Sequence, residues 1–322
     1  MIINRTHSIP IKCSVKLPIQ SLESFSSDLH PSVFQITHNT KYAYSTQILS
    51  SKHLLRLQPV TDTSQLVLSY ECSVSVGKGD VCNFIGAFGN NASFLEINEP
   101  YSELSIVSKS IVVVQELPKR LDVLHQPRTL PMIWMPWDRM MMQAYLQPPE
   151  LPESELFELA EYAMSFVKKK HSDVYDILMN MNETIYKEYK YKQGVTSLST
   201  TPYEVYRSRE GVCQDFANLL ICLLRLLDIP ARYRTGYLFT DTDDKNKAQA
   251  DATHAWVEVY CPYFGWMGLD PTNGCRAEKD HIRVACGRHF SDATPTSGTI
   301  FEAKGEVEES LSTSVQVVRL NS

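Results

Sequence analysis

The 322-residue chain lacks the features that mark several large classes of protein. Its 13 glycines follow no triplet repeat, which excludes a collagen-like chain. No run of 18 apolar residues is present, so no membrane-spanning helix is predicted. A formal net charge of −6, without a basic stripe, argues against nucleic acid as a partner. With 43% hydrophobic and 21% charged residues, the chain has the composition of a globular protein with a sizeable core.

Cysteine is sparse, and its spacing matches no metal or redox motif. The eight cysteines include no C-x-x-C pair, and their density is far below that of a disulfide scaffold. A metal site built from Cys261, Cys275, Cys286 and His281 has no supporting spacing, so we predict neither metal nor cofactor. The N-terminal segment has no continuous apolar region of the kind found in secretory signals. We therefore expect a cytoplasmic protein with free thiols and no membrane partner.

The residue pattern divides the chain into four parts. Residues 1–30 are polar and predict an N-terminal extension or a peripheral strand. Residues 31–117 alternate between apolar and polar positions, which predicts a β-rich N-terminal domain. Seven of the 17 prolines fall within residues 118–152, which we interpret as an ordered connector. Residues 153–322 first show helical periodicity and then strands, and they form a core with C-terminal strands.

The connector carries large apolar side chains that a flexible linker would lack. Trp134, Trp137 and three consecutive methionines (Met140, Met141 and Met142) need a surface to cover. The simplest surface is the junction between the β-rich domain and the core. We predict a fixed arrangement in which the β-rich domain forms one wall of a cleft.

Helical periodicity predicts four helices after the connector, at 154–170, 172–189, 204–208 and 211–229. The last is the clearest, because its apolar residues recur at helical spacing along one continuous face. Cys213 lies at the start of this helix. Unpaired N–H groups and the helix dipole favour a thiolate there, although a buried structural cysteine is also common.

A β-hairpin is predicted over residues 255–270, with its turn centred near 263. In that register Asp270 faces Trp256, and His254 is a diagonal neighbour on the same face of the sheet. Taken alone, His254 reads as an ordinary structural or surface histidine, and Asp270 as an ordinary turn residue before a proline. Together with Cys213 they have the composition of a nucleophile, a base and a residue that orients the base.

The residues around these three positions resemble the transglutaminase-like superfamily, in its bacterial two-domain form. The resemblance rests on four separated segments: Gly211–Ala217 (GVCQDFA), Ile229–Tyr233 (IPARY), His254–Val259 (HAWVEV) and Trp266–Thr272 (WMGLDPT). It implies an α+β fold in which an N-terminal β domain precedes a papain-like core, with the cysteine-bearing helix packed on an antiparallel sheet. It also implies that Cys213, His254 and Asp270 form a catalytic triad.

The same resemblance implies acyl transfer at an amide carbonyl of a peptide or protein, through a thioester on the enzyme. Hydrolysis of a peptide or amide bond is our first expectation. Cross-linking of protein glutamine to an amine is the alternative enzymatic reading. The animal cross-linking enzymes carry tryptophan after the nucleophile, whereas this chain has Gln214. A binding or scaffold protein without catalysis is the third reading, which the presence of all three triad residues disfavours.

The acidic loop 241–246 fails as an EF-hand, because Lys245 holds a ligand position and no glutamate closes the loop. Tyr191 and Gln193 are candidates to line an oxyanion hole, where the backbone N–H of Cys213 is the expected main donor. The sequence leaves the substrate and the oligomeric state undetermined.

Overall fold

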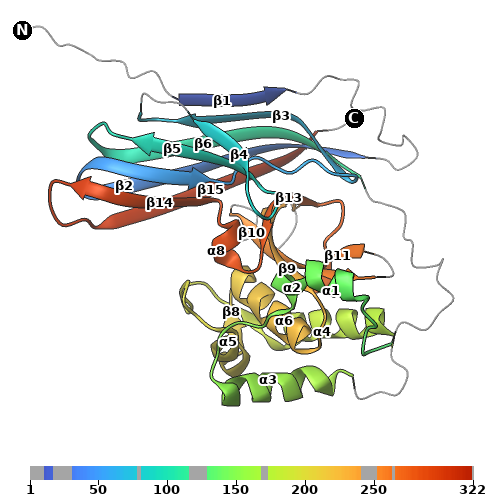
Figure 1. Ribbon diagram of the computed structural model, residues 1–322. Coiled ribbons are helices and arrows are strands. Elements are labelled where there is room, and N and C mark those ends of the chain that lie inside the picture. The colour runs from blue at the N-terminus through green and yellow to red at the C-terminus, as the bar shows by residue number, and fades with distance from the viewer. Residues whose placement is uncertain are drawn as a thin grey trace, which may run out of the picture.

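The computed structural model describes residues 11–16, 31–77, 81–115, 129–167, 173–240, 252–262 and 265–320, and it has the predicted α+β fold. The acidic loop 241–246 lies outside these residues. In Figure 1 a large sheet lies above a smaller one, and most helices lie below the smaller sheet. Among the described residues, no helix is both long and apolar enough to cross a membrane.

The large sheet is built around one long strand, β2 (Ser32–Leu55). Its burial alternates along much of its length, because successive side chains point to opposite faces of the sheet. Different strands pair with different stretches of β2, and two of these strands come from the C-terminal part of the chain. The other strands of this sheet are β1 (Ile11–Lys16), β3 (Gln65–Val74), β4 (Cys82–Ile85), β5 (Asn91–Ile97), β6 (Tyr101–Val114), β14 (Thr296–Ala303) and β15 (Glu309–Leu320).

The two C-terminal strands correct one boundary of the sequence analysis. Residues 153–322 were assigned to the core together with these strands. Instead, β14 and β15 pair antiparallel with β2, and β15 does so from Glu309↔Tyr44 to Leu320↔Val33. The chain therefore returns to its N-terminal sheet after completing the core. Backbone pairing over this distance leaves no local mark in the sequence, which is why the strands were predicted but misplaced.

The core consists of a five-stranded antiparallel sheet with helices packed on it (Figure 1). Its strands, in spatial order, are β12 (Cys275–Arg276), β11 (Gly265–Asp270), β10 (His254–Cys261), β9 (Ala231–Leu238) and β13 (His281–Gly287). A small parallel pair joins β7 (Lys190–Tyr191) to β8 (Glu210–Gly211). The helices are α1 (Pro136–Met141), α2 (Gln143–Leu146), α3 (Glu153–Ser165), α4 (Val174–Glu188), α5 (Pro202–Ser208), α6 (Cys213–Leu226) and α8 (Phe290–Ala293).

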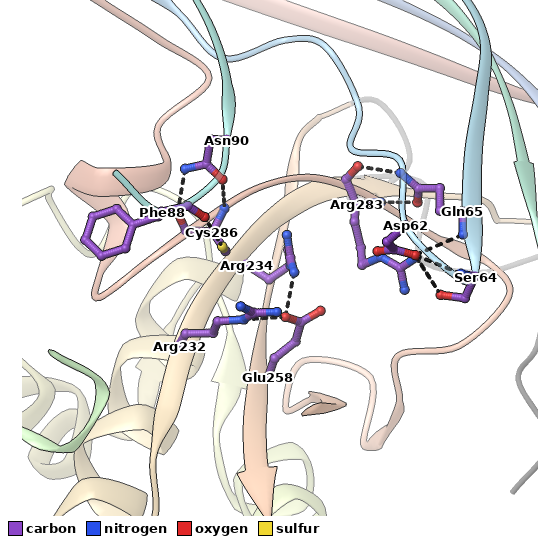
Figure 2. Close-up of polar contacts among 10 residues, drawn as sticks. All are labelled: Asp62, Ser64, Gln65, Phe88, Asn90, Arg232, Arg234, Glu258, Arg283 and Cys286. Atoms are coloured by element: carbon purple, nitrogen blue, oxygen red, sulfur yellow. Dashed lines mark hydrogen bonds and ion pairs between the residues drawn. The ribbon is translucent and has the colours of Figure 1, made fainter. Parts of the chain in front are cut away.

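Hydrogen bonds join the two sheets, as Figure 2 shows. The Asn90 side chain donates to the carbonyl of Cys286 at 2.7 Å and accepts from its N–H at 2.8 Å. The Gln65 side chain does the same with Arg283, donating to its carbonyl and accepting from its N–H, both at 2.8 Å. The Arg283 guanidinium pairs with Asp62 at 2.9 Å. Backbone groups on β13, an edge strand of the small sheet, thus hydrogen-bond to side chains from the N-terminal part of the chain.

The connector supports the junction through one of the expected residues, Trp134, and through Tyr145, which was not among them. Trp134 stacks on Tyr260, and Tyr145 packs against Trp266 of the core. The Tyr145 ring also packs against Phe88, so it spans both parts of the chain. The neighbouring residues named in the sequence analysis behave otherwise, since the following are largely exposed: Trp137 (63%), Met140 (78%) and Met141 (75%). The expectation that they cover the junction is wrong.

The Gln65 contacts provide a test of the junction. Gln65 is fully buried, and replacing it with alanine leaves the Arg283 N–H without its partner, while the Arg283 carbonyl keeps the hydrogen bond from the Val60 N–H. We expect Gln65→Ala to lower the free energy of unfolding by about 2–3 kcal/mol, measured by urea denaturation. Gln316→Ala, at an exposed position of β15, should change it by less than about 0.5 kcal/mol. Equal effects of the two variants on the free energy of unfolding would show that the Gln65 contacts at the junction do not stabilise the fold.

Candidate active site

The first candidate residue, Cys213, is held by the helix that it begins. Cys213 is partly buried, whereas the apolar face of α6 behind it is fully buried against β9, β10 and neighbouring helices. Burying a leucine side chain stabilises a fold by roughly 1.5–3 kcal/mol. The leucines of α6 with no exposed surface are Leu219, Leu220, Leu223 and Leu224. The helix therefore fixes the position of its N-terminal thiol.

The turn before Cys213 is shaped by a buried carboxylate. Asp215 accepts a hydrogen bond from the Val212 N–H at 2.8 Å and another from the Thr196 hydroxyl at 2.7 Å. The first bond caps the helix through one of its unpaired N–H groups. Gly211 packs closely on this carboxylate, and a Cβ atom there would meet the Asp215 Cβ at 2.9 Å. The segment that delivers the thiol is therefore sterically defined.

Tyr191 lies on the other side of this turn. The parallel pairing of β7 with β8 places Tyr191 opposite Gly211. Burial raises the pKa of Tyr191 to about 12, with a smaller contribution from the charge of Cys213, and a hydrogen bond with Gln193 acts in the opposite direction. Tyr191 and Gln193 thus lie together near the candidate nucleophile, and their part in an oxyanion hole stays a prediction.

His254 and Asp270 meet as the hairpin register predicts. β10 and β11 pair antiparallel from Val257↔Leu269 to Cys261↔Gly265, which is the predicted register. His254 begins β10 and Asp270 ends β11, and both are almost completely buried. His254 Nε2 donates to Asp270 Oδ2 at 2.7 Å, because an ionised carboxylate can only accept.

The Asp270 carboxylate receives four further hydrogen bonds. Its Oδ1 accepts from the backbone N–H groups of Thr272 at 3.0 Å and Asn273 at 3.2 Å. Its Oδ2 accepts from the Asn273 side-chain amide at 2.7 Å and from His281 Nε2 at 3.0 Å. A buried carboxylate with this many donors is kept ionised and fixed in orientation.

The charge states follow from these contacts. Burial alone would lower the pKa of His254, but the charge and hydrogen bond of Asp270, followed by a hydrogen bond to Cys213, raise it to about 10. Burial alone would raise the pKa of Asp270. The charge and hydrogen bond of His254, with the hydrogen bond from His281, hold it well below its usual range. Near neutral pH these contacts favour the imidazolium form of His254, which lies between the Asp270 carboxylate and the Cys213 sulfur.

Two members of this cluster were missed in the sequence analysis as partners of Asp270. Asn273 follows Asp270 by three residues in the turn, a spacing at which local side-chain hydrogen bonds are common, so a signal was present. His281 was considered only in a cysteine-based metal site. Its nitrogen, that of His254 and an oxygen of Asp270 all lie within 4.8 Å of one another. The distances of 2.7 and 3.0 Å to one carboxylate oxygen are those of hydrogen bonds.

The fold and these contacts define a class of protein in which a β-rich N-terminal region precedes a core. In this core cysteine, histidine and aspartate meet where β10 begins and β11 ends. Two family models match the chain in that order. The model of the bacterial transglutaminase-like N-terminal region matches residues 34–113, and that of the transglutaminase-like superfamily matches residues 160–271. The chain belongs to the transglutaminase-like superfamily, as its motifs indicated.

Comparison with individual proteins agrees with this assignment. An uncharacterized protein of Mycobacterium bovis is 32% identical over 286 residues, which cover 83% of this chain and 87% of that protein. A protein-glutamine gamma-glutamyltransferase of Pseudomonas aeruginosa is 33% identical over 88 residues, 26% of this chain and 13% of that protein. A crystal structure from Cytophaga hutchinsonii, described as "a Putative Cysteine Protease", has the same fold. Its TM-score is 0.71 at 22% identity, and the match covers 97% of this chain and 94% of that one.

Proposed function

We propose that the protein is a cysteine-dependent acyl-transfer enzyme that hydrolyses a peptide or amide bond. In this proposal Cys213 is the nucleophile, His254 is the general base and acid, and Asp270 orients His254. One observation carries the proposal. A buried His254 donates Nε2–H to Asp270 at 2.7 Å and also hydrogen-bonds to the thiol at the N-terminus of α6.

The reaction follows from the roles of these groups. In the reacting form the thiol proton of Cys213 resides on His254. The Cys213 thiolate attacks the carbonyl carbon, and backbone N–H groups at the start of α6 stabilise the resulting oxyanion. The C–N bond breaks as the leaving amine takes a proton from His254, which leaves a thioester on Cys213. Water then attacks the thioester and gives a proton to His254. The C–S bond breaks, the acid is released, and the thiolate–imidazolium pair is restored.

Transfer to an amine is the second candidate reaction. It shares every step up to the thioester, after which an amine takes the place of water. The local similarity to the Pseudomonas protein-glutamine gamma-glutamyltransferase favours keeping it. Products of peptide incubations with and without an added primary amine, measured by mass spectrometry, distinguish the two reactions. A mass increase that corresponds to the bound amine indicates transfer, whereas a shorter peptide or a free acid indicates hydrolysis.

Selective alkylation tests the proposed nucleophile without a known substrate. At pH 6, iodoacetamide should modify Cys213 at least about tenfold faster than the more exposed Cys82 and Cys275, because Cys213 lies beside the His254 imidazolium. Burial and nearby carboxylates raise the pKa of Cys275 to about 12, which keeps it unreactive. The buried Cys222 and Cys261 should react more slowly still. Peptide mass spectrometry over time gives each rate, and a Cys213 rate no higher than that of Cys82 would overturn the assignment.

A further inference from the structure

The proposed triad leaves one contact of Asp270 without a role. His281 begins β13 and is 6% exposed. Its Nε2 lies 3.0 Å from Asp270 Oδ2, the oxygen that accepts from His254 at 2.7 Å. The ionised carboxylate offers no proton, so His281 is the donor. Two imidazoles from different strands therefore hold one carboxylate oxygen.

The sheet builds this arrangement across β9. His254 pairs with Gly236 on one side of β9, and His281 pairs with Leu238 on the other. The Trp256 ring packs against both imidazoles, with centroids 6.0 Å from His254 and 5.2 Å from His281. A Cβ atom at Gly236 would meet Trp256 at 2.6 Å, so the ring occupies space that only glycine leaves open. The position of His281 is thus specified by the core and not by a loop.

We propose that His281 is a positioning residue, which holds Asp270 Oδ2 in line with His254 so that the base stays oriented toward Cys213. This inference rests on the proposed function. The remaining donors to Asp270 come from Thr272 and Asn273, in the turn that follows β11. They hold the carboxylate from the turn side alone. His281 supplies the donor from the sheet, on the same side as His254, and its loss allows Oδ2 to turn toward Asn273.

A cavity of about 360 Å³ lies behind His281 and Asn273. Its charges are partly compensated, since Arg276 pairs with Glu278 and Asp280 pairs with Arg319. The other titratable or charged groups near the cluster come from α6, α4, β12 and the segment after β12: Cys213, Tyr186, Cys275 and Lys279. Among the described residues, His281 is the group beyond His254 that places a titratable nitrogen on the carboxylate.

Two amide substitutions at position 281 distinguish the effect of the hydrogen bond to Asp270 from the effect of side-chain packing. The amide nitrogen of glutamine reaches about as far as Nε2 of histidine, whereas that of asparagine reaches only as far as Nδ1. His281→Gln should keep the rate of Cys213 alkylation within about twofold of the wild type from pH 5 to 10. His281→Asn should be about tenfold slower at pH 6, the scale expected for losing a hydrogen bond to a charged group. The midpoint of the pH dependence of Cys213 alkylation should also lie at lower pH in His281→Asn than in the wild type.

The control is a buried histidine elsewhere in the protein. His53 is 3% exposed and hydrogen-bonds Ser51 and Tyr101 within the large sheet. Its glutamine and asparagine variants should leave the Cys213 profile unchanged. Equal rates for His281→Gln and His281→Asn, whether both normal or both impaired, would overturn the positioning role. If His281→Asn does not fold, His281→Met takes its place, since it fills similar space without a donor.

The outcomes distinguish this inference from the proposed function. Wild-type Cys213 that reacts no faster than Cys82 would contradict the proposed function itself. Selective Cys213 labelling that is impaired by Asp270→Asn, but equal for His281→Gln and His281→Asn, would contradict only the positioning role.

Discussion

Replacing Cys213 with alanine is expected to abolish thioester formation and every product derived from it. The side chain supplies the atom that bonds to the substrate carbonyl, and no neighbouring group can replace it in that position. The fold should persist, because alanine is the most favourable residue in a helix and Cys213 contributes no capping hydrogen bond. Peptide libraries with and without an amine probe, analysed by mass spectrometry, provide the measurement.

Cys82→Ala is the matched control for this experiment. Cys82 is an exposed free thiol on β4 of the large sheet, so its removal tests for general effects of losing a cysteine. It should leave product formation unchanged. Products that persist in the Cys213→Ala protein would assign the chemistry to another group. A wild-type protein that binds peptides but forms no thioester would favour the binding or scaffold alternative.

The hairpin that joins His254 to Asp270 was predictable because it depends on local pairing. A short turn fixes the register, and the register fixes which side chains share a face. The observed pairing of Val257 with Leu269 is the one that the turn near residue 263 requires. The position of Cys213 was predictable for a similar reason, since helical periodicity marks both the helix and its first turn. These features belong to segments of fewer than 20 residues.

The features that could not be predicted depend on pairing between distant segments. β15 pairs with β2 although more than 260 residues separate the paired positions, and no pattern within either strand indicates which strand it pairs with. His281 reaches Asp270 only because β13 is placed beside β9, on the far side from β10. The exposed side chains of Trp137 and Met140 show the converse. Hydrophobicity predicts that a residue tends to be buried, but not which neighbour covers it.

The second large effect is expected from Asp270→Asn. In the serine proteases the corresponding substitution lowers kcat by about 10⁴, because the amide favours the wrong tautomer of the base. Here we expect a loss of about 10² to 10³ in kcat/KM, since a thiol is intrinsically more acidic than a hydroxyl and needs less help from the base. The amide group also faces three donors, from His254, His281 and Asn273, where Oδ2 had accepted from all of them. In one orientation the asparagine NH2 faces these three donors, and in the other it faces the backbone N–H groups of Thr272 and Asn273, so donors lose their acceptor in either orientation.

The contacts of His254 also predict the direction in which Asp270→Asn shifts the pH profile. The Asp270 charge raises the pKa of His254 to about 10, so the imidazolium persists through neutral pH and is lost as the pH rises toward that value. Without this charge, burial dominates and lowers the pKa of His254. The midpoint of the pH dependence of Cys213 alkylation should therefore lie at lower pH in Asp270→Asn than in the wild type.

Asp228→Asn is the matched control for Asp270→Asn. Asp228 lies at the surface, pairs with Arg139 and has a positive φ that asparagine tolerates, so its substitution should leave the pH profile in place. An Asp270→Asn protein with the wild-type rate and profile would show that His254 is oriented without its carboxylate. It would thereby remove Asp270 from the proposed triad, while the assignment of Cys213 would still stand on its own labelling and substitution results.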